Sequence, residues 1–118
     1  MKLSIQLVKE HGNLDKERII LKALEDVDIG NYMIADTTYI DEDQVSNKLR
    51  HTFWLPDVKV NKGDLIVIYT KTGNESIKKN KSGNKTYFFY WELGRTIWNQ
   101  DEDAAAIFLV DNWISKKV

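Results

Sequence analysis

The sequence contains no cysteine and a single proline among its 118 residues. The absence of cysteine excludes a disulfide framework, a thiolate metal site and a cysteine nucleophile. The formal net charge is −1, so the chain as a whole has no electrostatic attraction to nucleic acid or to a membrane surface. No apolar run approaches the length of a transmembrane segment, and residues 1–12 lack the pattern of a signal peptide. We therefore expect a soluble protein that is intracellular, in the cytoplasm.

Hydrophobic residues make up 42% of the chain and charged residues 30%, a balance that is typical of folded domains. A chain of this length buries about two-thirds of its unfolded surface in one core. No internal repeat, Pro-rich linker or low-complexity tract divides the sequence. We expect one domain that spans residues 1–118.

The most apolar stretch runs from Ala104 to Val110 and follows a polar, acidic segment at 98–103. Seven apolar residues are too few for a buried helix with its caps, but they fit a strand that is covered on both faces. We expect this strand to be central, with Ile107, Phe108, Leu109 and Val110 in the core, and the preceding segment to be a turn that faces water. Residues 111–114 would then close the domain.

Other strand signals are alternation of polar and apolar residues, β-branched pairs and flanking turn residues. The segment 17–24 also fits one short helix, but its paired isoleucines favour a strand. Pro56 has no amide to give to a sheet and ends the strand before it. The expected strands lie at 3–7, 19–21, 32–35, 50–55, 64–71 and 86–93. With 104–110 they predict an all-β sandwich of about seven to eight strands.

Three motifs in this order resemble the lamin tail domain, an immunoglobulin-like β-sandwich that also occurs as an accessory module in bacterial proteins. Residues 17–40 (ERIILKALEDVDIGNYMIADTTYI) resemble the opening of that family, and residues 53–68 (FWLPDVKVNKGDLIVI) resemble its next segment, with Gly63 at the turn. Residues 97–109 (IWNQDEDAAAIFL) resemble its Trp-Asn strand. The resemblance implies a fold and a binding role and implies no reaction. A longer, basic loop at 72–85 and an extra first strand depart from the family pattern.

Charge is separated along the chain. Residues 25–47 contain seven acidic residues and no Lys or Arg, for a local charge of −7, whereas residues 71–85 contain five lysines and one glutamate, for a local charge of +4. If these segments form opposite faces, the protein can associate with its own copies or with an oppositely charged partner.

The basic loop holds the main candidates for a functional site. Its lysines can contact phosphates, and Tyr87, Tyr90 and Trp91 nearby can stack on bases if they face solvent. Trp54 and Trp91 are candidate anchors for a partner, because tryptophan is enriched at interfaces. We expect a non-catalytic module that binds a macromolecule, most of all a protein, with nucleic-acid binding as the alternative. The candidate partner-binding residues are Lys78, Lys79, Lys81, Lys85, Trp54 and Trp91.

Signals for catalysis are weak. The acidic triplets Asp41–Asp43 and Asp101–Asp103 offer oxygen ligands for a divalent cation, but neither has the spacing of a calcium loop. His11 and His51 lie forty residues apart in the sequence, and no serine occupies a nucleophile elbow. We expect no catalytic residue, no metal ligand and no cofactor. A metal-dependent enzyme that uses the 101–103 turn is the remaining alternative.

Overall fold

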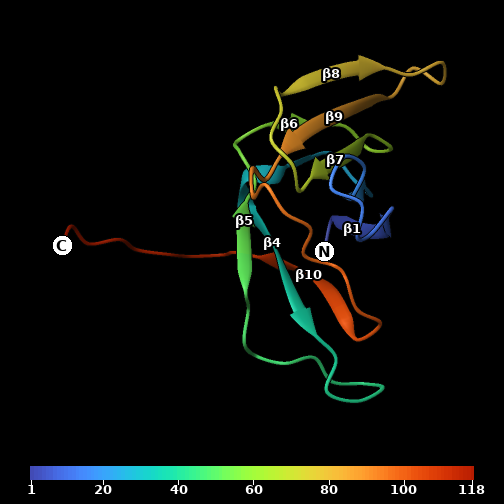
Figure 1. Cartoon of the computed structure of the whole chain (residues 1–118). Coiled ribbons are helices and arrows are strands. Elements are labelled where there is room, and N and C mark those ends of the chain that lie inside the picture. The colour runs from blue at the N-terminus through green and yellow to red at the C-terminus, as the bar shows by residue number, and fades with distance from the viewer.

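The computed structural model describes residues 1–118, which form ten strands and one short 3-10 turn (Figure 1). The prediction of an all-β chain is confirmed. The strand count is higher than predicted, because β3 (Val27–Asp28) and β6 (Lys59–Val60) are two-residue strands and β8 (Ser76–Lys79) lies inside the basic loop. The structure contains no helix with the length and apolar character that crossing a membrane requires.

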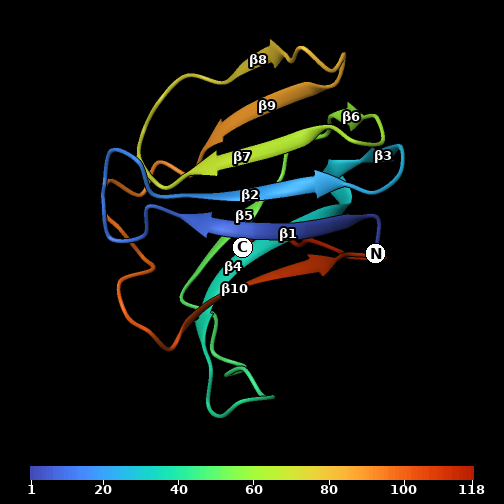
Figure 2. The same ribbon diagram turned by 90° about the vertical axis from the view of Figure 1, so that its right-hand side faces the viewer.

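The larger sheet has five strands in the order β1-β2-β7-β9-β8, which Figure 2 shows one below another from β8 at the top. The segment that also fitted a helix is strand β2, paired with β1 and β7. β7 and β9 run parallel, and β8 and β9 form an antiparallel hairpin. The bounds are β1 Leu3–Lys9, β2 Arg18–Ala23, β7 Leu65–Tyr69 and β9 Lys85–Tyr90.

The smaller sheet has three strands in the order β10-β4-β5. The bounds are β4 Tyr32–Thr38, β5 His51–Trp54 and β10 Asp103–Leu109. β5 ends before Pro56, as predicted, but one residue earlier than the predicted strand at 50–55. β3 pairs with β6, and the 3-10 turn Ile29–Asn31 leads from β3 into β4.

Both sheets contribute to one hydrophobic core. Side chains of the larger sheet alternate into it, as in Ile66 and Ile68, and Tyr32 and Ile34 enter it from β4. All four are at most 1% exposed. This arrangement is compatible with the predicted β-sandwich.

The expectation that β10 lies at the centre of the core is wrong. β10 pairs with β4 on one side only and forms an edge of the smaller sheet. Ala104 is its one buried residue, at 7% exposure, whereas Phe108 is 36% exposed and Leu109 is 52% exposed. The apolar run predicted a strand correctly, and Ile107 packs against the core as expected, but Phe108 and Leu109 at the end of the strand lie at the surface.

The residues after β10 do not close the domain as expected. The chain extends away from the sheets (Figure 1), and Ile114 is 93% exposed. Trp113 packs edge-on against Trp54, with ring centroids 4.7 Å apart, while remaining 58% exposed.

Glu17 connects three parts of the chain from inside the protein. Its side chain is fully buried, and its carboxylate accepts hydrogen bonds from the Thr70 hydroxyl at 2.9 Å and from the Ile97 and Trp98 amides at 3.0 Å each. A fourth bond comes from the amide of Gly12 at 3.0 Å. These donors stabilise a charge that is otherwise costly to bury. They also hold Trp98 inside, at 3% exposure, although the sequence suggested a turn that faces water from this residue onward.

Candidate functional site

The four predicted lysines lie together on the β8–β9 hairpin. Lys78 and Lys79 belong to β8, Lys81 lies in the turn, and Lys85 begins β9, and all four are exposed. The one ion pair of a Lys or Arg side chain joins Arg50 to Asp103, and His51 contacts Asp36 as described below. No carboxylate of the chain therefore neutralises any of these lysines.

The hairpin is an ordered element rather than only a loop. β8 pairs with β9 from Ser76–Phe88 to Lys79–Lys85, and the turn is closed by the amide of Asn80, which donates to the carbonyl of Asn84 at 2.7 Å. Gly83 takes a φ of 91°, which favours glycine, and allows this tight return. The Asn80 side chain also exchanges hydrogen bonds with the Thr86 hydroxyl at 3.0 and 3.2 Å.

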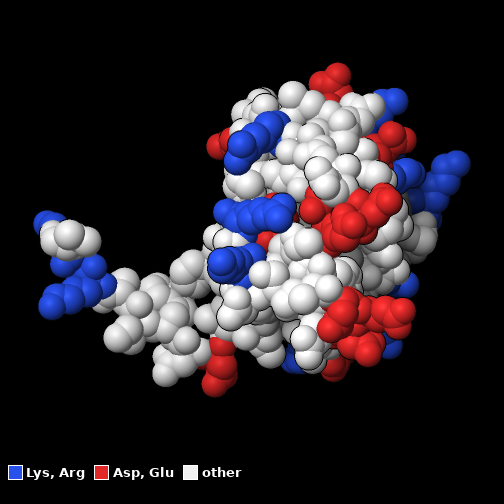
Figure 3. Space-filling view, turned by 60° about the horizontal axis from the view of Figure 1, so that its bottom comes forward, with Lys and Arg blue, Asp and Glu red and all other residues white.

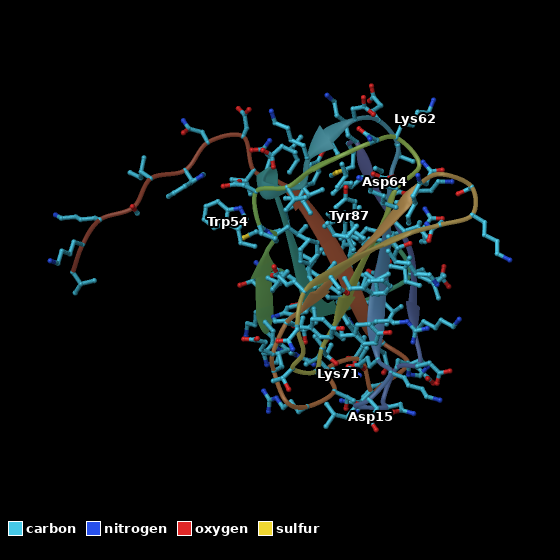
Figure 4. The ribbon with its side chains drawn as sticks, turned by 90° about the horizontal axis from the view of Figure 1, so that it is seen from above. Asp15, Trp54, Lys62, Asp64, Lys71 and Tyr87 are labelled. Atoms are coloured by element: carbon cyan, nitrogen blue, oxygen red, sulfur yellow. The ribbon has the colours of Figure 1, made fainter.

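The turn end of the hairpin is fixed to the turn before β7. The buried carboxylate of Asp64 accepts from the amides of Lys85 at 2.9 Å and Asn61 at 2.8 Å. The Asn84 side chain donates to the carbonyl of Lys62 at 3.2 Å. Figure 4 shows Lys62 and Asp64 beside the hairpin. The lysines therefore project from a supported strand pair.

Tyr87 lies on β9 near Asp64 (Figure 4) and is 6% exposed. Burial raises the pKa of Tyr87 above its ordinary value of 10.0, and the nearby Asp64 carboxylate raises it further. Both effects oppose the phenolate, so this side chain is a neutral core residue.

The predicted aromatic anchors lie apart from the lysines. Trp91 is 8% exposed and packs against Phe53 and Trp98, with ring centroids 5.8 and 5.9 Å away, so it is a core residue and offers no surface to a partner. Trp54 is 45% exposed, and its indole N–H donates to the carbonyl of Gly30 at 2.7 Å. Trp54 belongs to the smaller sheet and lies on the other side of the molecule from the hairpin tip (Figure 4).

The aromatic residues of β9 beside the lysines are Tyr87 and Phe89, which are buried, and Phe88 and Tyr90, which are half-buried. Tyr87 is buried, and the half-buried Tyr90 stacks on Tyr69 with ring centroids 5.4 Å apart. Tyr90 also lies against Gly73, where any side chain would meet its ring. The exposed large apolar residue on the hairpin is Ile77, at 63%.

The acidic segment 25–47 does not form one face. Asp36 is buried, whereas Asp28 caps the 3-10 turn by accepting from the amide of Gly30 at 2.9 Å.

The fold instead brings the acidic 41–43 loop beside the acidic 101–103 loop, which is far away in the sequence. Both loops lie at the end of the molecule opposite the hairpin (Figure 1), and Figure 3, which brings that end forward, shows carboxylates gathered along one side. A hollow of about 450 Å³ there is lined by Tyr39, Ile40, Asp41, Glu42, Asp101 and Glu102.

Two of the acidic residues hold their own turns. Asp41 accepts from the amides of Asp43 and Gln44, both at 2.9 Å, and Asp103 accepts from the amides of Asn99 and Gln100 at 2.8 and 2.9 Å. No three His, Asp or Glu side chains lie close enough together to hold a metal ion.

The fold brings together one charged constellation that the sequence did not indicate. The Nδ1 atom of His51 lies 3.1 Å from both oxygens of Asp36, and its Nε2 atom lies 2.8 Å from a guanidinium nitrogen of Arg95. Both ring nitrogens are thus occupied by side chains of the protein itself, and neither is free for a substrate. His11 is exposed in the turn between β1 and β2.

No family model and no curated protein matches this chain.

Sequence reasoning missed the strand character of 76–79. A signal was present: Asn80 to Asn84 is rich in turn residues, with Gly83 near its end, and it precedes the strong strand signal at 86–93. A hairpin turn of this kind requires a partner strand before it. The single apolar residue of that partner, Ile77, gave too little alternation to reveal it.

Proposed function

We propose that this chain is a non-catalytic module that recruits a protein partner through the β8–β9 hairpin. The observation that carries the proposal is a group of four exposed lysines without a carboxylate partner, held on a supported strand pair at the edge of a sheet. Unpaired lysines on one element attract an acidic surface and accelerate its association. The residues proposed to contact the partner are Lys78, Lys79, Lys81 and Lys85.

Nucleic-acid binding is the alternative, since the same lysines fit phosphates. Two observations favour a protein. Tyr87 is buried and Tyr90 stacks on Tyr69, so neither of these predicted stacking residues is placed to stack on bases. Ile77 stands exposed among the lysines, and an apolar side chain adds to a protein interface but adds little to contacts with a phosphate backbone.

The test compares an acidic peptide with single-stranded and duplex DNA of equal charge, each titrated into the protein. We expect the peptide to bind and the affinity to fall with added salt. Replacing Lys78, Lys79, Lys81 and Lys85 by alanine should abolish binding. The matched control replaces the exposed lysines Lys2, Lys9, Lys16 and Lys48 by alanine and should retain it. Preference for DNA would replace this proposal by the alternative, and absence of binding to any probe would end both.

We propose further that the fold is an immunoglobulin-like β-sandwich similar to the lamin tail domain. In support, the first motif covers β2 to β4, the second covers β5 to β7 with Gly63 in the turn, and the third runs into β10. β1, β8 and β9 lie outside these motifs. An experimental structure superimposed on a lamin tail domain tests the likeness, and a different order of strands in the sheets would refute it.

A further inference from the structure

We infer that the hairpin binds an extended acidic segment of its partner as an additional strand along the free edge of β8. The inference rests on the proposed protein-binding function and specifies the form of the partner at that site. In such binding, main-chain hydrogen bonds supply affinity and alternate side chains supply specificity.

The backbone of β8 has hydrogen-bonding groups that the protein does not use. Asn80 donates to Asn84, and Lys78 lies opposite Thr86 in the same register. Because hydrogen-bonded and non-hydrogen-bonded pairs alternate in an antiparallel ladder, Ile77 and Lys79 form non-hydrogen-bonded pairs with β9. Their N–H and C=O groups therefore point away from β9. β8 is the last strand of its sheet, so these groups face an open edge.

The side chains along this edge indicate which strand would fit. Ile77 lies opposite Tyr87, a core residue, and so stands on the core-facing side of the sheet, where it is nonetheless 63% exposed. A neighbouring strand with an apolar residue at this level would cover it. Lys78 and Lys79, one on each face, would then lie beside acidic residues. Opposite charges on neighbouring strands stabilise the pairing, and like charges weaken it.

The same charges argue against a second copy of this chain at this edge. Two β8 strands side by side would place lysines beside lysines, an arrangement by which edge strands avoid pairing with their own copies. An acidic strand would instead place carboxylates beside the lysines. The lysines thus disfavour the pairing of β8 with a second β8 strand and favour its pairing with an acidic segment.

β8 is also ordered before any partner arrives. The Asn80–Thr86 side-chain contacts and the link from Lys85 to Asp64 hold the hairpin in place. The protein therefore loses little conformational freedom on binding, which favours affinity.

The probe is the capped peptide acetyl-Thr-Glu-Glu-Val-Glu-Glu-Thr-amide, titrated into isotope-labelled protein and followed by NMR. Its sequence reads the same in both directions, so it places valine beside Ile77 in a parallel or an antiparallel strand. We expect the amide signals of Ile77 and Lys79 to shift most. Two further peptides carry N-methyl groups, one on the valine and one on the two glutamates that flank it. Alternate amides of a strand point to opposite sides, so one methylated peptide should bind at least about tenfold more weakly and the other close to the parent.

Two variants test the same point from the side of the protein. Ile77→Ala and Ile77→Pro both remove the apolar side chain, but only proline removes the outward N–H. We expect Ile77→Ala to weaken binding by no more than about fivefold, and Ile77→Pro to weaken it by at least about tenfold beyond that. The methylated peptides keep the test valid if Ile77→Pro disturbs the hairpin.

The outcomes separate the inference from the function on which it rests. If the parent peptide binds, depends on the four lysines and is equally tolerant of both N-methyl patterns, strand addition is overturned while lysine-mediated binding stands. If no acidic peptide binds, or if binding persists without the four lysines, the proposed function fails and the inference fails with it. Loss of binding with one methyl pattern only supports both.

Discussion

The carboxylate of Asp64 accepts a hydrogen bond from the backbone amide of Lys85 at 2.9 Å. Its other oxygen accepts from the amide of Asn61 at 2.8 Å, and Gly63 between them takes a φ of 92°. One buried side chain therefore fixes both the turn that begins β7 and the residue that begins β9. This contact adds to the pairing of β9 with β7 in holding the lysine-bearing hairpin against the rest of the sheet.

Asp64→Asn should lower the stability of the protein. An amide presents one acceptor oxygen, so either the Lys85 or the Asn61 amide loses its partner inside the protein. We expect a loss of about 1–3 kcal/mol in the free energy of unfolding, measured by urea denaturation. Hydrogen exchange at the Lys85 amide should accelerate as well. Asp57→Asn is the control, because Asp57 is exposed, and an equal midpoint for the two variants would contradict the role of Asp64.

Tyr87 should produce a decline in stability at alkaline pH. In the unfolded chain its pKa is near the ordinary value of 10.0, whereas burial and Asp64 raise the pKa in the folded protein. The stability that this group contributes is thus complete below the unfolded pKa and is lost as pH rises through the folded pKa. Between about pH 9 and 11, the free energy of unfolding should fall more steeply for the natural protein than for Tyr87→Phe. Tyr39→Phe, at a residue 49% exposed, should keep the natural slope.

Glu17→Gln should be more costly than any exposed Glu→Gln change. The carboxylate accepts four hydrogen bonds, three of them from buried residues, and glutamine offers one acceptor oxygen in place of two. We expect a loss of about 2–5 kcal/mol in the free energy of unfolding, since each unpaired buried donor costs about 1–3 kcal/mol. Urea denaturation of Glu17→Gln measures this loss, and Glu10→Gln, at an exposed residue, is the control. Similar midpoints for both variants would show that the Glu17 contacts contribute little.

The opposite charges at the two ends should allow weak association between copies of the chain. We propose contact between the lysine hairpin of one copy and the loops 41–43 and 101–103 of another. The sedimentation coefficient should rise with protein concentration at about 0.01 M salt. It should stay constant at about 1 M salt, where charges are screened beyond about 3 Å. Replacing Asp41, Glu42 and Asp43 by their amides should remove the effect, whereas the same change at Glu10, Asp15 and Glu25 should not. Monomeric behaviour at every salt concentration would refute the contact.

The sequence by itself determined where the chain is extended and where it turns. The alternation in 3–7, the paired isoleucines at 19–20 and the position of Pro56 are local signals, because side-chain periodicity and backbone restriction act over a few residues. The all-β class followed from them. The four lysines were also found in this way, because they lie within one short segment.

Only the tertiary structure decided which strands are neighbours and which side chains are covered. Ala104–Val110 has the composition of a central strand, yet β10 lies at an edge, because no second strand pairs with its outer side. Trp54 and Trp91 both follow strand signals, but Trp91 lies under the packed sheets and Trp54 lies at their margin. Pairing and burial depend on contacts between residues far apart in the chain. The same reason explains why neither the free edge of β8 nor the Asp36–His51 contact was visible before the strands were assembled.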